Sequence, residues 1–248
     1  MIKKLVHYRL RFFLSMIILL LMPLDSSGAN NQSQTFQNRI YQAYITGNIS
    51  TWEKLLETLP ANPTESELYE MAMAHYGYIG YCMGRDEKRR ARPYLDRVED
   101  LTDRLLEISP ENPKYLALHG ALFGFRMGYQ PHKVPIIGPK SLKAINSALD
   151  HGPNCPEAWV ESANKDWYLP AAFGGSKERA IEHYLKAIEL MEQNLADYQG
   201  YWYYLNTHMI LAEWYNSRNQ AFLAKEVYRK LLAMEPNFQW ATEKLQEK

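Results

Sequence analysis

The sequence has 248 residues, enough for one substantial domain or one continuous array of small units. It carries 28 Lys and Arg against 28 Asp and Glu, and no basic stripe with interleaved aromatic residues. This balance gives no field that would attract a polyanion, so we expect no nucleic-acid partner.

The N-terminus has the pattern of a secretory signal peptide. A basic segment without any acid comes first and an apolar run over 12–21 follows; the bases are Lys3, Lys4, Arg9 and Arg11. Ser27 and Ala29 offer the small-x-small pattern of a cleavage site, so we predict a signal peptide over 1–29. A retained membrane anchor is the alternative, which the run disfavours because a spanning helix needs roughly 20 apolar residues.

Export sets the expected compartment. We predict secretion across the inner membrane and a periplasmic location, with no stable membrane anchor after cleavage. Cys82 and Cys155 are the two cysteines of the sequence, too few for a disulfide framework. An oxidising compartment permits one bridge between them. Two buried free thiols are favoured, because neither cysteine lies in a CxxC pair.

Helical periodicity begins near Phe36 and continues almost to the end of the chain, with Pro and Gly gathered between segments. A leading helix pair is predicted over 36–60, with helices over 36–46 and 51–59. The stretch from Ser50 to Glu53 matches a capping box, so we expect the second helix to begin there.

Four related segments follow the leading pair. They read Tyr76-x2-Ile79-Gly80-x2-Met83, Leu116-x2-His119-Gly120-x2-Phe123, Trp159-x2-Ser162-Ala163-x2-Asp166 and His208-x2-Leu211-Ala212-x2-Tyr215. The last continues with Ala224-x3-Tyr228 and Pro236, the spacing of a tetratricopeptide repeat. The pattern predicts an all-α, tetratricopeptide-like helical-hairpin solenoid with elongated helices and inserted loops.

The predicted solenoid is a single domain over 30–248. Its repeats cover approximately 64–112, 113–155, 156–195 and 200–238, and a capping helix covers 238–247. One position in each repeat is small, so that the second helix can approach the first; these residues are Gly80, Gly120, Ala163 and Ala212. A Leu at any of them is expected to overpack the pair, at a cost of about 1–3 kcal/mol.

Two stretches match at an offset of 36 residues, and both are expected to form the elbow between the helices of a repeat. "IIGPKSLKAI" begins at Ile136, and "AFGGSKERAI" begins at Ala172. The second raises the question of phosphate binding, because glycines and Lys177 precede a helix. A P-loop needs GxxxxGK[ST] after a strand, and neither condition is met. We therefore expect the glycines to form the turn and Ser176 to cap the next helix.

The region around this elbow resembles a known family. "NPKYLALHGALFGF", "GPNCPEAW" and "LPAAFGGSKERAIEHYLKAIEL" are similar to the tetratricopeptide proteins that serve as T-components of periplasmic TRAP-type solute transporters. The resemblance covers roughly 60–240. It implies a helical periplasmic subunit that docks with a solute-binding partner protein. The lipid-anchoring cysteine that some members carry is not found in this sequence.

Catalytic and metal-binding patterns are not found. The six histidines after the signal segment form no HExxH or Cys-His arrangement, and no GxSxG stretch occurs. We therefore predict no catalytic residue, no metal, no cofactor and no enzymatic activity. His119 and His208 occupy core-facing positions of the repeats, where a satisfied interior histidine is favoured over a ligand.

Candidate binding residues follow from a side of each helix other than its packing face. On the third repeat this stripe carries Asn164 and Trp167, and on the fourth it carries Asn206, Met209 and Glu213. Stacked repeats turn their first helices toward a concave surface, where such residues can meet a ligand. The cluster "YQGYWYYLN" is expected to be buried mostly as core.

The stretch from Gly124 to Gly138 is rich in Gly and Pro, so we predict a loop inserted between two helices. Arg126, Tyr129 and His132 could reach a ligand from it. Simple loop variation is an equal alternative.

The sequence thus predicts a non-catalytic exported scaffold that binds a partner protein or peptide in the cell envelope, with a periplasmic solute-binding protein as one candidate. The alternative is a small-solute-binding accessory subunit of a TRAP-type transporter. An open groove across several repeats would favour the first, and a closed aromatic pocket the second. A homo-oligomer remains an alternative to a monomer, because solenoid faces are common oligomer contacts.

Overall fold

The computed structural model describes residues 27–58 and 60–247, with side chains from Phe36 onward. These residues form twelve α-helices and two short 3-10 helices without a strand, which confirms the predicted all-α class. Residues 1–26 of the predicted signal peptide lie outside the described part, and its last three begin the first helix, α2. The chain divides into two compact units after Thr35, and the second unit, Phe36–Lys248, contains the packed helices.

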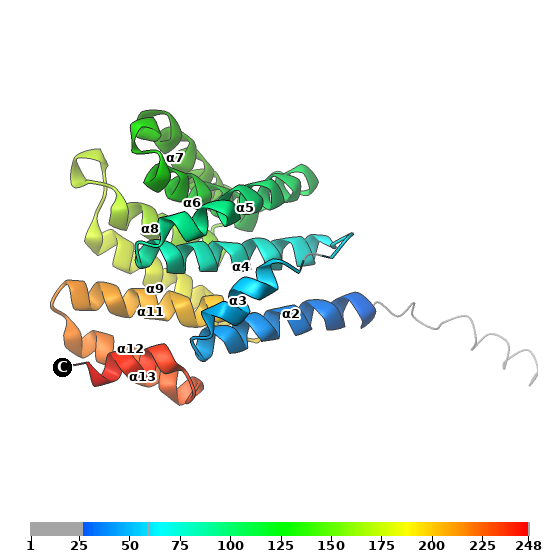
Figure 1. Cartoon of the computed structure of the whole chain (residues 1–248). Helices are drawn as coiled ribbons and strands as arrows, with labels where there is room; N and C mark the ends of the chain where they lie inside the picture. The colour runs from blue at the N-terminus through cyan, green and yellow to red at the C-terminus, as the bar shows by residue number, and fades with distance from the viewer. Residues whose placement is uncertain (1–26, 59, 248) are drawn as a thin grey trace, which may run out of the picture. The chain divides into compact units, whose positions relative to one another are not determined.

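The helices follow one another in antiparallel hairpins (Figure 1). Each predicted repeat range contains one hairpin, and contacts between the two helices of a hairpin dominate the packing. The helices are α2 (Ser27–Ile45), α3 (Ile49–Leu56), α4 (Glu65–Gly84), α5 (Lys88–Ile108), α6 (Pro113–Tyr129), α7 (Val134–His151), α8 (Pro156–Tyr168), α9 (Lys177–Gln193), α10 (Leu195–Tyr198), α11 (Trp202–Ser217), α12 (Ala221–Met234) and α13 (Gln239–Gln246). In the described part, no helix combines the length and apolarity needed to cross a membrane.

Side-chain caps fix several helix starts, and one differs from the prediction. Asn48 caps α3 by accepting from the Thr51 amide at 3.1 Å, so the capping box predicted at Ser50 is wrong. Ser50 instead donates its hydroxyl to Asn48. A capping box does form at the start of α4, where Thr64 and Glu67 satisfy each other's backbone amides.

The segment from Gly124 to Gly138 is mostly helical, so the predicted inserted loop is wrong. The helix α6 continues to Tyr129, a 3-10 turn spans Pro131–Lys133, and α7 begins at Val134. Two features outweigh the glycines and prolines here. Prolines near a helix start cost little, because the first turn has no use for their missing amide hydrogen. In addition, Ile137 begins the buried stripe that packs α7 against α6.

The small residues of the predicted frame are not equivalent. At Gly120 an added Cβ would lie 2.6 Å from Ile145 Cγ1, which supports close approach of α6 and α7. At Gly80 the nearest atom would be Phe125 Cζ at 3.8 Å, an ordinary contact, so Gly80 is not a point of close approach as Gly120 is. Gly77 is the crowded glycine of α4, because Trp202 Cη2 would lie 2.5 Å from its added Cβ.

Two buried histidines show how the first predicted repeat aligns with the last one. His75 in α4 and His208 in α11 are both buried, and each ring Nδ1 contacts the carbonyl four residues earlier, at 2.8 and 3.0 Å. Burial lowers the pKa of both rings to about 4. The matching environments place His75, and not Tyr76, at the position of His208. The predicted frame of the first repeat is therefore one residue too late.

The helix α11 packs against α4 as well as against its neighbours in the chain. The Trp202 ring lies 5.9 Å from that of Tyr44 and 5.1 Å from that of Trp52, between α2, α3 and α4. One residue on, Tyr203 lies 6.3 Å from Tyr76 of α4. The cluster around "YWYY" is buried, as predicted. The first helices of the first and last hairpins therefore meet through these aromatic side chains.

Candidate functional site

The elbow between α8 and α9 is a closed turn. Gly174 has a φ of +92°, which favours glycine, and a Cβ on Gly175 would lie 1.7 Å from the Leu169 carbonyl oxygen, so only glycine fits at Gly175. Ser176 caps α9 by accepting from the Arg179 amide at 3.2 Å. The predicted turn and cap are confirmed.

The cationic side chains of this elbow already have partners within the chain. The Arg179 guanidinium donates to both carboxylate oxygens of the buried Asp166, each at 2.7 Å, and also to the Gly174 carbonyl. The Lys177 ammonium bonds the Trp167 carbonyl and lies 4.1 Å from the centre of that ring. The sister stretch differs, because Gly138 lies inside α7 and forms no elbow. The predicted equivalence of the two elbows is wrong.

Asn164 and Trp167, the predicted binding residues of α8, both make contacts within the chain. Asn164 donates to Glu161 at 3.0 Å and accepts from the Tyr184 hydroxyl at 3.2 Å. Trp167 is half-buried and stacks on Trp214 of α11 at 4.2 Å, with 2° between the ring planes. Both residues connect α8 to neighbouring helices.

The predicted residues of α6 clamp that helix to α5. Arg126 bonds Glu99 and Asp96, the latter at 2.8 Å, and the Tyr129 hydroxyl donates to the Lys88 carbonyl at 2.8 Å. His132 is exposed in the 3-10 turn. Since Gly124–Tyr129 is helical, Arg126 and Tyr129 do not project from a loop as predicted.

The three residues predicted to form a binding stripe on α11 have three different environments. Met209 is 0% exposed, so it cannot line a surface as predicted. Asn206 accepts from the Tyr44 hydroxyl at 3.2 Å, and Glu213 accepts from Tyr228 at 2.8 Å. The structure therefore does not bring the predicted residues of α6, α8 and α11 together into one site.

A different set of residues converges between the first helices of the four hairpins. They enclose a small cavity of about 10 Å³, and each of the four helices contributes to its wall. The wall consists of Met73, Tyr76, Lys114, Ala117, Leu118, Glu157, Glu161 and Tyr203. We call this space the interior cavity.

Two buried carboxylates of α8 face the interior cavity, Glu157 at 3% and Glu161 at 4% exposure. They lie four residues apart, which places them on one face of the helix. Glu157 accepts from the Tyr198 hydroxyl at 3.1 Å and pairs with the Lys114 ammonium at 3.3 Å. Glu161 accepts from the Tyr76 hydroxyl at 2.8 Å.

Burial sets the protonation of the groups around this cavity. It raises the pKa of Glu161 to about 7, although hydrogen bonds from Asn164 and Tyr76 act in the opposite direction. It also raises the pKa of the Cys155 thiol to about 12, so that thiol stays protonated and is a poor nucleophile. Both cysteines are free and buried, in agreement with the favoured prediction.

Ser162, His183 and Asp166 are the nearest approach to a catalytic group. The Ser162 hydroxyl lies 3.2 Å from His183 Nδ1, and Asp166 Oδ2 lies 3.2 Å from the same nitrogen. A serine nucleophile and its supporting acid must use opposite ring nitrogens, so this is not a catalytic triad. Among the described residues, no three His, Cys, Asp or Glu side chains are placed to hold a metal ion.

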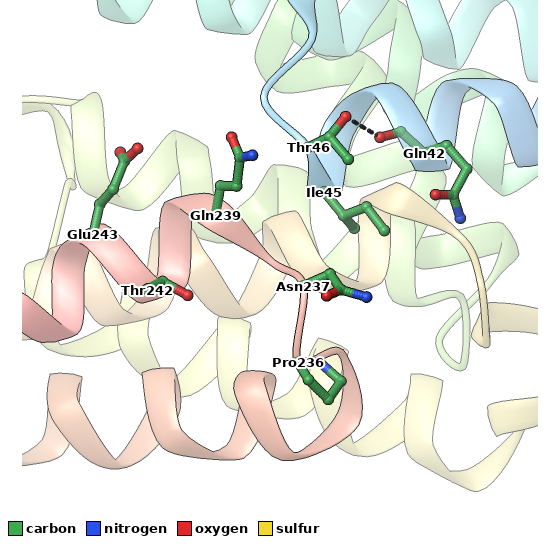
Figure 2. Close-up of a pocket in the computed structure, with 8 residues that line it drawn as sticks. All are labelled: Gln42, Ile45, Thr46, Pro236, Asn237, Gln239, Thr242 and Glu243. Carbon is green, nitrogen blue, oxygen red and sulfur yellow. Dashed lines mark hydrogen bonds between the residues drawn. The ribbon is translucent and has the colours of Figure 1, made fainter.

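The second candidate site is an open groove between the end of α2 and the start of α13, with a volume of about 570 Å³ (Figure 2). It is lined by Gln42, Ile45, Thr46, Pro236, Asn237, Gln239, Thr242 and Glu243. We call it the terminal groove. Near it, the Tyr41 hydroxyl of α2 donates to Glu235 at 3.0 Å, and the Tyr44 ring packs against those of Phe238 and Trp240.

Unpaired amides mark the terminal groove. Gln42, Asn237 and Gln239 are exposed, and their side chains make no hydrogen bond within the described residues. Figure 2 shows the amides of Gln42 and Asn237 turned toward the space between α2 and the connection that precedes α13. The Thr46 hydroxyl is already used, because it donates to the Gln42 carbonyl at 2.6 Å. Three side chains that both donate and accept are therefore free to bind.

Sequence reasoning found neither site. One pattern in the sequence pointed to the interior cavity. Glu157 and Glu161 lie on a helix face whose other residues are Val160 and Asn164. No pattern pointed to the terminal groove, because its two sides lie at opposite ends of the chain.

Comparison with known proteins identifies no family. No protein-family model matches the chain, and no curated protein matches it. Among solved structures the chain is similar to the "HusA haemophore from Porphyromonas gingivalis", with a TM-score of 0.43 and 17% identity over 88% of this chain and 98% of that one. A likeness at this level does not establish a shared binding site, so the proposals below depend on the contacts of this chain alone.

Proposed function

We propose that this protein is a non-catalytic exported scaffold, and that it binds an extended segment of a partner protein in the terminal groove. The observation that carries the proposal is the set of three unpaired amides, Gln42, Asn237 and Gln239, around an open hollow. An extended backbone presents alternating N–H and C=O groups, and an amide side chain can satisfy both kinds.

The character of the groove supports a peptide over a compact apolar solute. Small-molecule pockets are mostly apolar and enclosed, whereas this hollow is open and six of its eight lining residues carry an amide, a hydroxyl or a carboxylate. Glu243 is exposed and has no ion pair within the described residues, so it adds a preference for a segment that carries a basic residue.

The inner face supports the same choice. A tetratricopeptide-like array would be expected to hold a peptide against its first helices, but here α11 meets α4 and tyrosines fill the space. Export and a periplasmic location remain part of the proposal through the predicted signal peptide at 1–29. A periplasmic solute-binding protein remains one candidate partner.

Site-specific photo-crosslinking in the native envelope tests this proposal. A crosslinking residue at Gln239 is expected to capture a second polypeptide, whereas one at Asn146, exposed on α7, is expected to capture none. Gln42→Ala and Asn237→Ala should weaken that capture without lowering the melting temperature, because both side chains are exposed and unpaired.

Two results would contradict the proposal. One is equal capture from Gln239 and Asn146. The other is native mass spectrometry of residues 30–248 that shows a co-purifying small molecule and no second polypeptide, which would favour the small-solute alternative.

A further inference from the structure

The interior cavity has an unbalanced charge. Its wall carries two carboxylates, Glu157 and Glu161, but only one cation, Lys114. Lys114 pairs with Glu157 at 3.3 Å, and its ammonium also lies 5.7 Å and 6.0 Å from the ring centres of Tyr69 and Tyr198. Glu161 has no ion pair within the described residues; its partners are the neutral donors Tyr76 and Asn164.

A buried carboxylate without a cation is costly, so it takes up either a proton or a positive charge. The raised pKa of Glu161, about 7, follows from its burial without a cation. At neutral pH the carboxyl is thus divided between its two states. A single positive charge beside it would balance the cavity.

The cavity has room for one group of that charge. Its volume of about 10 Å³ is close to what one water-sized group needs. Tyr203 is only 1% exposed, lines the cavity, and makes no hydrogen bond through its hydroxyl within the described residues. A hydroxyl without a partner, in the same wall as two carboxylates, offers an acceptor for a further donor.

The shape and chemistry select among cations. Two tyrosines line the cavity, and the ring centres of Tyr76 and Tyr203 are 6.3 Å apart. Aromatic faces attract ammonium groups, and a primary ammonium brings N–H donors to each carboxylate. Lys114 already shows this mode of binding, with one carboxylate and two tyrosine rings. A metal ion fits less well, because no three ligating side chains converge in the described chain.

We propose that the interior cavity binds one ammonium group, held between Glu157, Glu161 and the Tyr203 hydroxyl. The group is either the free ammonium ion or the head of a primary amine that enters beside the half-exposed Lys114. This site is separate from the terminal groove and does not depend on the partner proposed there.

Thermal melts of the mature chain, residues 30–248, provide the test. At pH 8 and constant ionic strength, ammonium chloride is expected to raise the melting temperature in a saturable way, and sodium chloride is not. Methylammonium distinguishes the two sources. It should act like ammonium if the site admits an amine head, and should have no effect if only the free ion fits. Equal effects of ammonium and sodium would overturn the proposal.

Glu161→Gln keeps the shape of the side chain and removes its charge. We expect it to weaken ammonium binding by at least about tenfold, which is about 1.4 kcal/mol. The matched control is Glu189→Gln, at a half-exposed carboxylate of α9 that pairs with Lys186, and it should bind like the wild type. Unchanged affinity in Glu161→Gln would contradict the proposal.

Two further measurements keep the test decisive. Ammonium binding should weaken as the pH falls through about 7, because Glu161 takes up a proton there, and a flat profile would contradict the assignment. If Glu161→Gln does not fold, Lys114→Met takes its place. Loss of the internal cation should tighten ammonium binding by about tenfold, and unchanged affinity would overturn the proposal.

Discussion

The two stretches that match at an offset of 36 residues form different structures. "AFGGSKERAI" makes a true elbow, in which Gly174 has a φ of +92° and Ser176 begins α9. "IIGPKSLKAI" lies entirely within α7, and Gly138 is an ordinary helical residue. Although both stretches have a glycine at the aligned position, only Gly174 forms a turn.

One buried side chain accounts for much of the difference. Ile137 is 8% exposed and extends the buried stripe of α7 by a turn, together with Ser141 and Ala144. The matching residue of the other stretch, Phe173, is 75% exposed and gives no such support. Helix formation here follows the packing of the apolar face more than the local propensity of glycine and proline.

Aligning two repeats therefore predicts which residues are buried more reliably than it predicts where a turn forms. Ala144 and Ala180 align, and both are buried against the first helix of their hairpin. The turns around them diverge, because a turn depends on the contacts of its own backbone. Four substitutions test this contrast.

Gly175→Ala should have the largest effect. The new Cβ would lie 1.7 Å from the Leu169 carbonyl oxygen, and a backbone atom cannot move aside as a side chain can. We expect the free energy of unfolding to fall by about 3 kcal/mol or more, measured by chemical denaturation. A loss below about 1 kcal/mol would show that the elbow can rearrange.

Arg179→Met should have the next largest effect, because it leaves the carboxylate of Asp166, 1% exposed, without its bidentate partner. We expect a loss of about 2 kcal/mol in the same measurement. The matched control is Lys143→Met, at the aligned and exposed position of α7, which should change stability by less than about 0.5 kcal/mol. Similar losses in both would contradict the contrast between the two stretches.

Gly174→Ala should cost about 1 kcal/mol. Its added Cβ meets no atom within 4 Å, so the cost comes from the positive φ alone. Equilibrium unfolding at several denaturant concentrations would show a lower midpoint with an unchanged slope. A wild-type midpoint would mean that the turn does not require its left-handed conformation.

Gly138→Ala should have the smallest effect, and of opposite sign. In the interior of α7 alanine is a better helix former than glycine, and the nearest atom to the new Cβ would be Met127 Sδ at 3.8 Å. We expect a gain of about 0.5 kcal/mol, seen as a higher melting temperature. A loss there would indicate that Gly138 has a turn role after all.

The fold was largely accessible from the sequence. Periodicity identified the helical class, and the positions of Gly120 and Ala212 identified the close approach within two hairpins. The first hairpin was placed one residue too late, because Tyr76 and Gly80 match the motif by type while His75 holds the packing position. Residue type alone cannot separate two frames that differ by one residue when both contain aromatic residues.

The sites were not accessible in the same way. Local spacing assigned Asn206, Met209 and Glu213 to a free surface, but Met209 is buried and the other two bond neighbouring helices. These outcomes depend on contacts of α11 with other helices, such as α2 for Asn206 and α12 for Glu213, which no local pattern records. The interior cavity and the terminal groove both arise from contacts between distant parts of the chain, and so require the folded arrangement.

The bonds from α2 to the last hairpin also bear on how the chain folds. Tyr44 bonds Asn206, 162 residues away, and Tyr41 bonds Glu235, 194 residues away. An open helical array can grow from any repeat and lose its end repeats one at a time. Here the first and last helices stabilise each other, so we expect removal of either to weaken the whole unit. Contacts of such long range also slow folding, because the chain must close a large loop before they form.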